Sequence, residues 1–566
     1  MPAFRRELFE GQSKANAQEN GAATQNGVHP TETLDAVVVG AGFAGVYIHY
    51  KLQKAGFKSK IIEAGDALGG IWAWNRYPDA RVDSQYPIYA YSIPEVYEDW
   101  YWNSDYPDHN DMRAYFEHVD KKLGIKKDTY FDTAVETATW DDEECMWTLK
   151  CNTGLVVKAR HFAACIGFAA KRYFPVEWEG YENFEGFMCH SSFWPKDDVD
   201  VRGKKVAVIG TGATGVQIAQ NWGRHVGENG SLKIFQRTPN YACPMNIKYL
   251  TKEQQDVDKE RYPELFDQRW VNYNGFLYQF RDESMFDYTP EQRKELFDML
   301  WNMGGFRYLM NNTKDLTRDF KANRIGYDYW RDRIHERVED PETAEILAPK
   351  EPPHLFGGKR LSLEQDYYDN FNKPNVHIVD MKRSPIVKFE KNGIRQEDGT
   401  FHELDIVALA TGFDSITGGM NAIEIRGKNG ELLNGKWKDG VYTYLGMTST
   451  GFPNFYFTYG PQGPTAFSNG PSCNELQGDW IVDVMQYMKD HGLKSIDPKK
   501  KEELRWKQTV TELSLVGVRG HTHSWYDGSN IPGKKVEPLN YAGGIPVYIK
   551  EISHETKNEY PGFDLR

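Results

Sequence analysis

The sequence is poor in cysteine: its 566 residues include six, with no CxxC pair and no Cys/His cluster of zinc-binding spacing. This scarcity argues against a metal site and against a disulfide reductase, which needs a redox Cys pair. It predicts six reduced thiols in a cytoplasmic protein. Positively charged residues are also in the minority: the sequence has 68 Lys and Arg but 81 Asp and Glu, which gives a net charge of −13. We therefore expect no nucleic-acid partner, since Lys and Arg supply the affinity for phosphate backbones.

Long hydrophobic runs are absent as well. No apolar run reaches the ~18 residues that a membrane-spanning helix requires, and the longest, residues 36–48, is interrupted by glycines. Residues 1–30 are polar, lack the apolar core of a signal peptide, and are expected to form a poorly ordered arm. What remains has the composition of a globular protein of several domains, with 14% aromatic residues that favour lined pockets.

The first informative segment begins with apolar residues 36–39, typical of a buried strand, followed by a glycine-rich turn and a helical stretch to Lys54. A second apolar strand, residues 58–62, ends at Glu63. In such a unit the glycines allow a tight turn, close approach of the backbone to a pyrophosphate, and close helix packing, while the acidic residue accepts hydrogen bonds from a ribose. The glycine-rich turn is a GxGxxG motif comprising Gly40, Gly42, Phe43 and Gly45.

A second unit of this kind follows the apolar residues 205–209. Its next strand ends at Arg237 and Thr238, where the first unit has Glu63. A carboxylate would repel the 2′-phosphate of NADPH, whereas a guanidinium beside a hydroxyl would bind it. The sequence therefore predicts FAD at the first loop and NADPH at the second. The second loop comprises Gly210, Thr211, Gly212 and Gly215.

These patterns predict an α/β protein with two Rossmann-like domains. An apolar strand within residues 403–414 runs into Ala-Thr-Gly and is expected to return the chain to the flavin domain. Residues 241–349 lack strand signals but show helical spacing, which predicts a helical insertion. The expected parts are an FAD-binding domain at 31–165 and 396–566, an NADPH-binding domain at 172–240 and 350–395, and the insertion at 241–349.

Two further stretches carry a family resemblance: GGIWAWNRYPDARVDSQYPIYAYS, from Gly69, and FEGFMCHSSFWP, from Phe184. With the two loops they resemble the Baeyer–Villiger monooxygenases over about residues 35–550. The resemblance implies NADPH- and O2-dependent conversion of ketones, with cyclic ketones expected, to lactones or esters. The second stretch matches the family fingerprint F-x-G-x-x-x-H-x-x-x-W-P, which separates this family from flavin monooxygenases that oxidise nitrogen or sulfur. The matched residues are Phe184, Gly186, His190, Trp194 and Pro195.

The resemblance also implies residue roles. In the family, reduced flavin and O2 give a C4a-peroxyflavin that must stay deprotonated, and a fixed cation favours that anion. Arg360 is the implied cation, also next to NADPH, and Asp83 is the carboxylate that holds it over the flavin. Lys359 is implied at the 2′-phosphate, and Trp525 on a mobile loop that closes over NADP+. The other implied flavin contacts are Gly70, Ile71, Trp72, Asn75, Tyr89 and, at the adenine, Val135.

His190 is interpreted as a structural hinge between the two domains, because a histidine can donate and accept hydrogen bonds at once. Two features depart from the family pattern. Asp79 stands where the family usually has Gly, which is expected to alter the shape or charge of that turn. Gly357 and Gly358 suggest a more flexible approach to Arg360.

Two other classes of function remain open from the sequence. One is a flavin monooxygenase that acts on amines or sulfides, or an NADPH oxidase that releases peroxide. The other is a dinucleotide-binding module without turnover. The expected partners are a small-molecule ketone and O2, in a monomer or weak oligomer.

Overall fold

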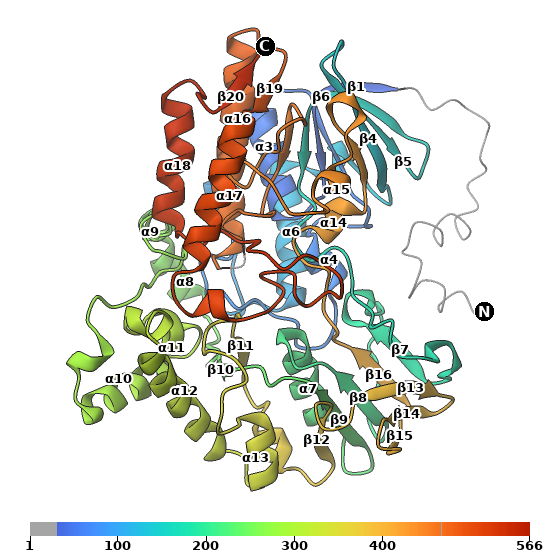
Figure 1. Ribbon diagram of the computed structural model, residues 1–566, viewed down its shortest axis with the longest axis vertical. Coiled ribbons are helices and arrows are strands. Elements are labelled where there is room, and N and C mark those ends of the chain that lie inside the picture. The colour runs from blue at the N-terminus through green and yellow to red at the C-terminus, as the bar shows by residue number, and fades with distance from the viewer. Residues whose placement is uncertain (1–30, 466) are drawn as a thin grey trace.

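The computed structural model describes residues 31–465 and 467–566, so the arm expected at 1–30 lies outside the described residues. An eight-stranded sheet, which we call the first sheet, has the order β17-β4-β5-β6-β1-β2-β3, with β18 alongside β6. It occupies the upper part of the molecule in Figure 1. Its strands are β1 (Glu32–Val39), β2 (Ser59–Ile62), β3 (Thr129–Tyr130), β4 (Val135–Asp141), β5 (Met146–Cys151), β6 (Val156–Ala164), β17 (Glu424–Arg426) and β18 (Phe455–Phe457).

The first glycine-rich turn joins β1 to helix α3 (Phe43–Lys54). The strand β1 is parallel to both β2 and β6, and its last four residues are buried, which explains why this segment is an uninterrupted apolar run. Helix α3 packs against α16, where a Cβ atom on Gly478 would lie 2.8 Å from the Tyr47 ring. The other helices around this sheet are α4 (Ile71–Trp74), α5 (Pro94–Tyr97), α6 (His109–Leu123), α14 (Gly418–Asn421), α15 (Leu433–Lys436), α16 (Gly470–Asp490), α17 (Lys500–Ser514) and α18 (Ile545–Lys557).

The second sheet contains five parallel strands in the order β12-β9-β8-β16-β7. The second glycine-rich turn joins β8 to α7 (Ala213–His225). The two strand–loop–helix units confirm the α/β class with two Rossmann-like domains. The strands are β7 (Phe187–His190), β8 (Lys205–Ile209), β9 (Ser231–Gln236), β12 (Val376–Asp380) and β16 (Ile406–Leu409), and a three-stranded antiparallel sheet follows β12 with β13 (Ile386–Glu390), β14 (Gly393–Gln396) and β15 (Phe401–Glu403).

One expectation about this part is wrong. The strand in 403–414 was expected in the flavin domain, but β16 pairs with β7 and β8 in the second sheet. The chain therefore leaves the second sheet after Leu409, and not near residue 396. The physical reason is that a short, fully buried strand fits the parallel part of either sheet equally well.

Residues 241–349 fold into helices, seen at the lower left of Figure 1. The start of α10 has a capping box between Thr289 and Gln292, with Pro290 in the first turn. One short strand, β10 (Ala242–Pro244), pairs with β11 (Ser362–Glu364) and was not indicated by the sequence. The helices are α8 (Lys252–Lys259), α9 (Tyr262–Gln268), α10 (Pro290–Met303), α11 (Arg307–Met310), α12 (Phe320–His335) and α13 (Pro341–Leu347).

Two segments carry the chain between the sheets, residues 165–173 after β6 and residues 410–416 after β16. They run antiparallel and are hydrogen-bonded to each other: Tyr173 N–H donates to the Gly412 carbonyl at 3.0 Å. We call this pair the crossing segments, since they form the covalent link between the two sheets.

All six cysteines are free and buried, at positions 145, 151, 165, 189, 243 and 473. Burial raises the pKa of Cys165 and of Cys473 to about 12. Within residues 31–465 and 467–566, no cluster of three His, Cys, Asp or Glu side chains could hold a metal ion. Over the same residues, no helix is both long and apolar enough to cross a bilayer.

Candidate active site

A cavity of about 1120 Å³ lies where the two glycine-rich loops face each other. Side chains and backbone from both sheets line it, together with the segment around Arg360 and the C-terminal loop that carries Trp525. The carboxyl ends of parallel strands carry both loops, which is where α/β proteins bind ligands. Most of the predicted site residues meet in this one cavity. The exceptions are Gly45, Gly215 and the five fingerprint residues, which do not line it.

The first loop is shaped by close backbone contacts. Gly40 has a φ of 106°, a conformation that favours glycine, and a Cβ atom on Gly45 would lie 1.8 Å from the Gly40 carbonyl oxygen. A Cβ atom on Gly70 would come within 2.9 Å of the Gly42 Cα, so two bare backbones meet at the cavity wall. No side chain caps the N-terminus of α3, whose N–H groups can therefore bind a phosphate.

Glu63 is buried at the end of β2 and lines the cavity. Its two carboxylate oxygens accept hydrogen bonds from the backbone N–H groups of Ala41 and Gly65, each at 2.7 Å. Burial raises the pKa of Glu63, and these backbone hydrogen bonds oppose the rise. Each oxygen keeps a further lone pair, so the fixed carboxylate can accept hydrogen bonds from a ribose diol.

The predicted flavin contacts form one wall of the cavity. The Trp72 indole N–H donates to the Tyr89 hydroxyl at 3.2 Å, and Phe43 packs edge-on against Tyr89. Asn75 is buried, lines the cavity, and its Oδ1 has no hydrogen-bond partner among the described residues. An unpaired buried acceptor is costly, so this oxygen fits a polar group of a bound ligand. Val135, at the start of β4, lines the cavity near the Glu63 end of β2.

The second loop repeats the geometry of the first. Gly210 has a φ of 107°, and a Cβ atom on Gly215 would lie 2.0 Å from the Gly210 carbonyl oxygen. A Cβ atom on Gly212 would meet open space, so the cavity reaches the backbone there. The Thr211 hydroxyl donates to the Thr238 carbonyl at 3.1 Å, which ties the loop to the end of β9.

Arg237 and Lys359 are neighbouring cations on the cavity wall. Burial and the nearby Arg237 lower the pKa of Lys359 below its ordinary value. Neither side chain forms an ion pair with an acid in the part of the chain that the structure describes. The Asp527 carboxylate opposes the lowering of the Lys359 pKa. Two cations side by side fit a dianionic group such as the 2′-phosphate of NADPH.

Arg360 and Asp83 form a two-pronged ion pair on the same cavity. The Arg360 Nε donates to Asp83 Oδ2 at 2.6 Å, and its Nη2 donates to Oδ1 at 2.8 Å. The guanidinium also lies over the Phe306 ring, 4.9 Å from its centre. Burial opposes the charge of Arg360, but the Asp83 carboxylate outweighs it and raises the pKa of the guanidinium. The site therefore presents an oriented cation that stays protonated.

Trp525 lines the cavity beside the crossing segments. Its ring stacks on Phe168, with centres 5.3 Å apart and planes at 16°. The neighbouring Asn530 donates through its Nδ2 to the Phe413 carbonyl at 2.9 Å. The C-terminal loop thus contacts both crossing segments.

His190 is fully buried at the end of β7 and does not line the cavity. Its Nε2 donates to the Gly412 carbonyl at 3.1 Å, and its Nδ1 accepts from the Ser192 backbone N–H at 3.3 Å. Burial lowers the pKa of His190 to about 3, so the ring is neutral. It therefore links β7 to a crossing segment, while Trp194 packs against Trp222 of α7.

Some cavity residues were missed by sequence reasoning. Arg172 lines the cavity from a crossing segment, and its Nε donates to the Ser192 hydroxyl at 2.7 Å. Burial lowers the pKa of Arg172 to about 10. Its position shortly after the C-terminal end of β6 could have indicated a cavity residue. Asn530 lies in a loop, and no pattern in the sequence indicated that it lines the cavity.

The two departures have clear structural consequences. Asp79 has a φ of 61°, which is easiest for glycine and tolerated by aspartate. The expectation of a flexible approach to Arg360 is wrong: Gly357 and Gly358 are buried, and Cβ atoms there would come within 2.6 Å of Leu309 and 2.2 Å of Thr522. These glycines serve close packing.

Comparison with known proteins gives matches along most of the chain. A family model described as NAD(P)-binding Rossmann-like domain matches residues 38–109, and one described as L-lysine 6-monooxygenase/L-ornithine 5-monooxygenase matches residues 95–270. The chain is 44% identical to the FAD-binding monooxygenase acrE of Aspergillus aculeatus, over 94% of this chain and 89% of that protein. It is 40% identical to cyclopentanone 1,2-monooxygenase of Comamonas sp., over 94% and 96%. The crystal structure of OTEMO in complex with FAD and NADP has a TM-score of 0.90 and 33% identity, over 95% of this chain and all of that one.

Proposed function

Since the chain belongs to the Baeyer–Villiger monooxygenases, we propose that it uses NADPH and O2 to convert cyclic ketones to lactones. The balanced reaction consumes ketone, O2, NADPH and a proton, and yields the ester or lactone, water and NADP+. The observation that carries the proposal is the Arg360–Asp83 ion pair on a cavity shared by two dinucleotide loops.

The residues present fit both cofactors. FAD would lie on the first loop, with Glu63 at the ribose and Asn75 at a polar group of the ring. NADPH would lie on the second loop, with Arg237 and Lys359 at the 2′-phosphate. When bound, FAD supplies the redox chemistry, taking electrons from NADPH and passing them to O2. We assign Trp525 to cover the nicotinamide nucleotide, since its ring lines the cavity and stacks on Phe168 of a crossing segment.

Arg360 supplies the fixed positive charge. An oriented guanidinium on a cavity wall favours negative charge that develops on a ketone oxygen, and it needs no reorganisation to do so. Asp83 holds the plane of the guanidinium through both of its oxygens and keeps it protonated. Asp83 is therefore a positioning residue, and Arg360 the catalytic one.

A panel of cyclic and open-chain ketones with NADPH and the FAD-loaded protein tests the reaction. We expect products heavier by one oxygen, with lactones from cyclopentanone and its homologues. Arg360→Ala should still permit reduction of the flavin by NADPH, because electron transfer does not need this charge. Oxygenated product should fall by about 100-fold or more, the loss typical of removing a preorganised charge. Retained oxygenation in Arg360→Ala would refute the assignment.

The match of residues 95–270 to an amine-oxygenating family favours a second candidate, oxygenation of an amine. The same panel extended with primary amines and thioethers separates the two. Hydroxylamine products from the primary amines, without any lactone, would support this alternative. The six free thiols support the cytoplasmic location expected from the sequence.

A further inference from the structure

Helix α7 carries a polar stripe along one face. The residues at spacings of three and four along this face are Thr214, Gln217, Gln220, Asn221 and Arg224. Gln217 and Gln220 are buried, which is unusual for glutamine and calls for hydrogen-bond partners. The stripe begins at the second glycine-rich loop and runs the length of the helix.

The partner of this stripe is the segment 77–83, which ends at Asp83. The Tyr77 hydroxyl donates to Gln217 Oε1 at 3.0 Å, and Gln217 Nε2 donates to the Arg81 carbonyl at 3.1 Å. Further along α7, Gln220 donates to Asp79 Oδ2 at 3.1 Å. The helix of the second loop thus holds the segment that leads to Asp83 at several points.

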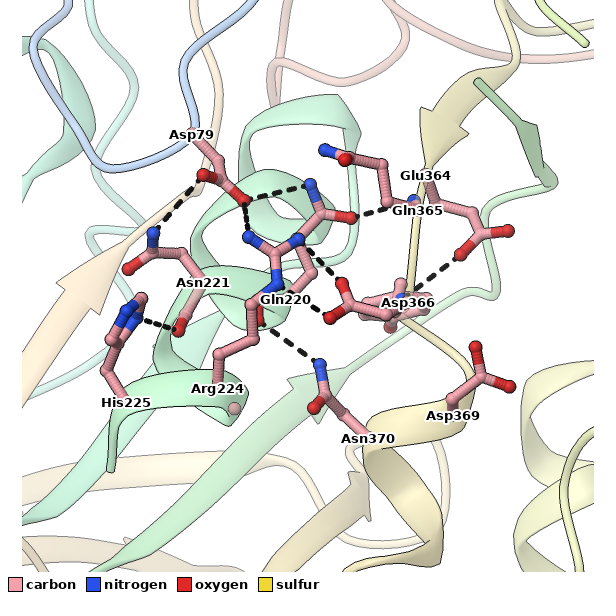
Figure 2. Close-up of polar contacts among 12 residues, drawn as sticks. Asp79, Gln220, Asn221, Arg224, His225, Glu364, Gln365, Asp366, Asp369 and Asn370 are labelled. Carbon is pink, nitrogen blue, oxygen red and sulfur yellow. Dashed lines mark hydrogen bonds and ion pairs between the residues drawn. The ribbon is translucent and has the colours of Figure 1, made fainter. Parts of the chain in front are cut away.

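The stripe ends in a bridge of charges, drawn in Figure 2, which we call the Arg224 bridge. Arg224 donates through Nη1 to Asp79 Oδ2 at 2.8 Å. It donates through Nε and Nη2 to the two oxygens of Asp366, at 2.6 and 2.7 Å. The three side chains are partly buried, and a two-pronged arginine–carboxylate contact fixes orientation as well as distance.

The Arg224 bridge joins two chain segments, which we call arms: one carries Asp83 and the other carries Arg360. Asp79 lies four residues before Asp83, and Asp366 lies six residues after Arg360. Between them stands the C-terminal end of α7, about 20 Å along the helix from the second loop at 1.5 Å per residue. We propose that Arg224 is a positioning residue for the Asp83–Arg360 pair, because it sets the separation of these two arms. This rests on the proposed function, which gives that pair its role.

The substitution Arg224→Gln tests this in the FAD-loaded full chain. We expect kcat for ketone oxygenation to fall by about tenfold, since a small misplacement of a catalytic group from a distance has effects of this order. KM for NADPH should change by a smaller factor than kcat, because the second loop and Arg237 lie outside the two segments that the bridge joins and only Lys359 lies on one of them. Arg202→Gln is the matched control, since Arg202 forms an exposed ion pair with Asp200 in the same domain. It should match the unaltered protein in both parameters.

Asp79→Asn keeps a residue that tolerates a positive φ but removes the charge. We expect a smaller fall in kcat, about threefold, because Arg224 keeps Asp366. The double variant with Arg224→Gln should lose no more than Arg224→Gln alone, since both changes break one bridge. Arg224→Lys should restore only part of the loss, because an ammonium lacks the planar fork. Fully additive losses, or complete rescue by lysine, would overturn the assignment.

Hydrogen exchange separates this inference from the proposed function, because it requires no turnover. In the resting FAD-loaded protein, Arg224→Gln should speed amide exchange in residues 77–84 and 357–366 together, and Arg202→Gln should speed neither. Unchanged amide exchange in both segments would refute the positioning role of Arg224, whatever the activity of the variant. If the unaltered protein oxygenates no ketone, the proposed function fails while the exchange result still decides the bridge.

Discussion

At the scale of residues, we expect two side chains to set the preference of the cavity for NADPH over NADH. Arg237 and Lys359 stand together on its wall, and neither forms an ion pair among the described residues, although the Asp527 carboxylate acts on Lys359 from a distance. A charge-assisted hydrogen bond contributes about 1.5–3 kcal/mol, so each cation separates phosphorylated from unphosphorylated nucleotide by about 10- to 100-fold. Arg237→Ala should therefore raise KM for NADPH by a factor in this range and leave KM for NADH nearly unchanged. Steady-state kinetics with both nucleotides check this, and an equal rise for NADH would contradict it.

The lowered pKa of Lys359 predicts a pH dependence for NADPH binding. Because the pKa lies below the ordinary 10.5, the ammonium loses its proton at a lower pH than an exposed lysine. KM for NADPH should thus rise as pH increases toward that lowered value, and KM for NADH should not. Lys359→Arg should abolish the rise, since arginine stays charged throughout. Titration of both KM values between pH 7 and 10 measures the effect.

At the residue scale, the sequence predicted which side chains meet in the cavity but not the contacts that hold them in place. Motif spacing was enough to bring Arg360, Asp83 and both loops to one cavity. The Arg224 bridge could not be foreseen, because its partners Asp79 and Asp366 lie 145 and 142 positions away and no motif contains all three. Asp79 was visible as a departure, and only the fold shows what its carboxylate contacts.

At the scale of elements, His190 joins β7 to a crossing segment through two hydrogen bonds. His190→Ala would leave the Ser192 N–H unpaired, would remove one of the two hydrogen bonds that the Gly412 carbonyl accepts, and would open a cavity, at a cost of about 2–4 kcal/mol. We expect a lower Tm, slower NADPH oxidation and more peroxide released per NADPH. Thermal unfolding and a peroxide assay measure these effects, with Arg202→Gln as the control. Unaltered turnover and coupling in His190→Ala would remove the hinge role.

Also at the scale of elements, sequence patterns predicted the bounds of a strand but not the sheet to which a strand belongs. The strand β8 has the predicted bounds of residues 205–209, because a glycine-rich turn marks its end. The strand β16 was assigned to the wrong sheet, because four buried apolar residues carry no information about their neighbours. Pairing across about 200 residues depends on the whole fold.

Across the whole molecule, several histidines are buried and neutral. Burial lowers the pKa of His49 to about 4, of His161 and His190 to about 3, and of His402 to about 4. In the unfolded chain each would titrate near 6.5, so below that pH the unfolded state binds more protons. Stability is therefore fully present above pH 6.5 and is lost as pH falls toward 4.

We expect Tm to be level between pH 8 and 7 and to fall below pH 6.5. Each such histidine contributes a slope of about 1.4 kcal/mol per pH unit. Thermal unfolding of the FAD-loaded protein across this range measures the total. His49→Asn, which can keep the contact to Ser59 but does not titrate, should reduce the slope. A constant Tm down to pH 5 would contradict the expectation.

The buried thiols make this chain convenient for site-specific labelling. Maleimides react with thiolates that solvent can reach, whereas all six native sulfurs are buried and burial raises the pKa of Cys165 and Cys473 to about 12. A single cysteine introduced on the surface would therefore carry a fluorophore without prior removal of the native ones. Two such dyes, one over each sheet, would report distances between the nucleotide-binding halves during turnover.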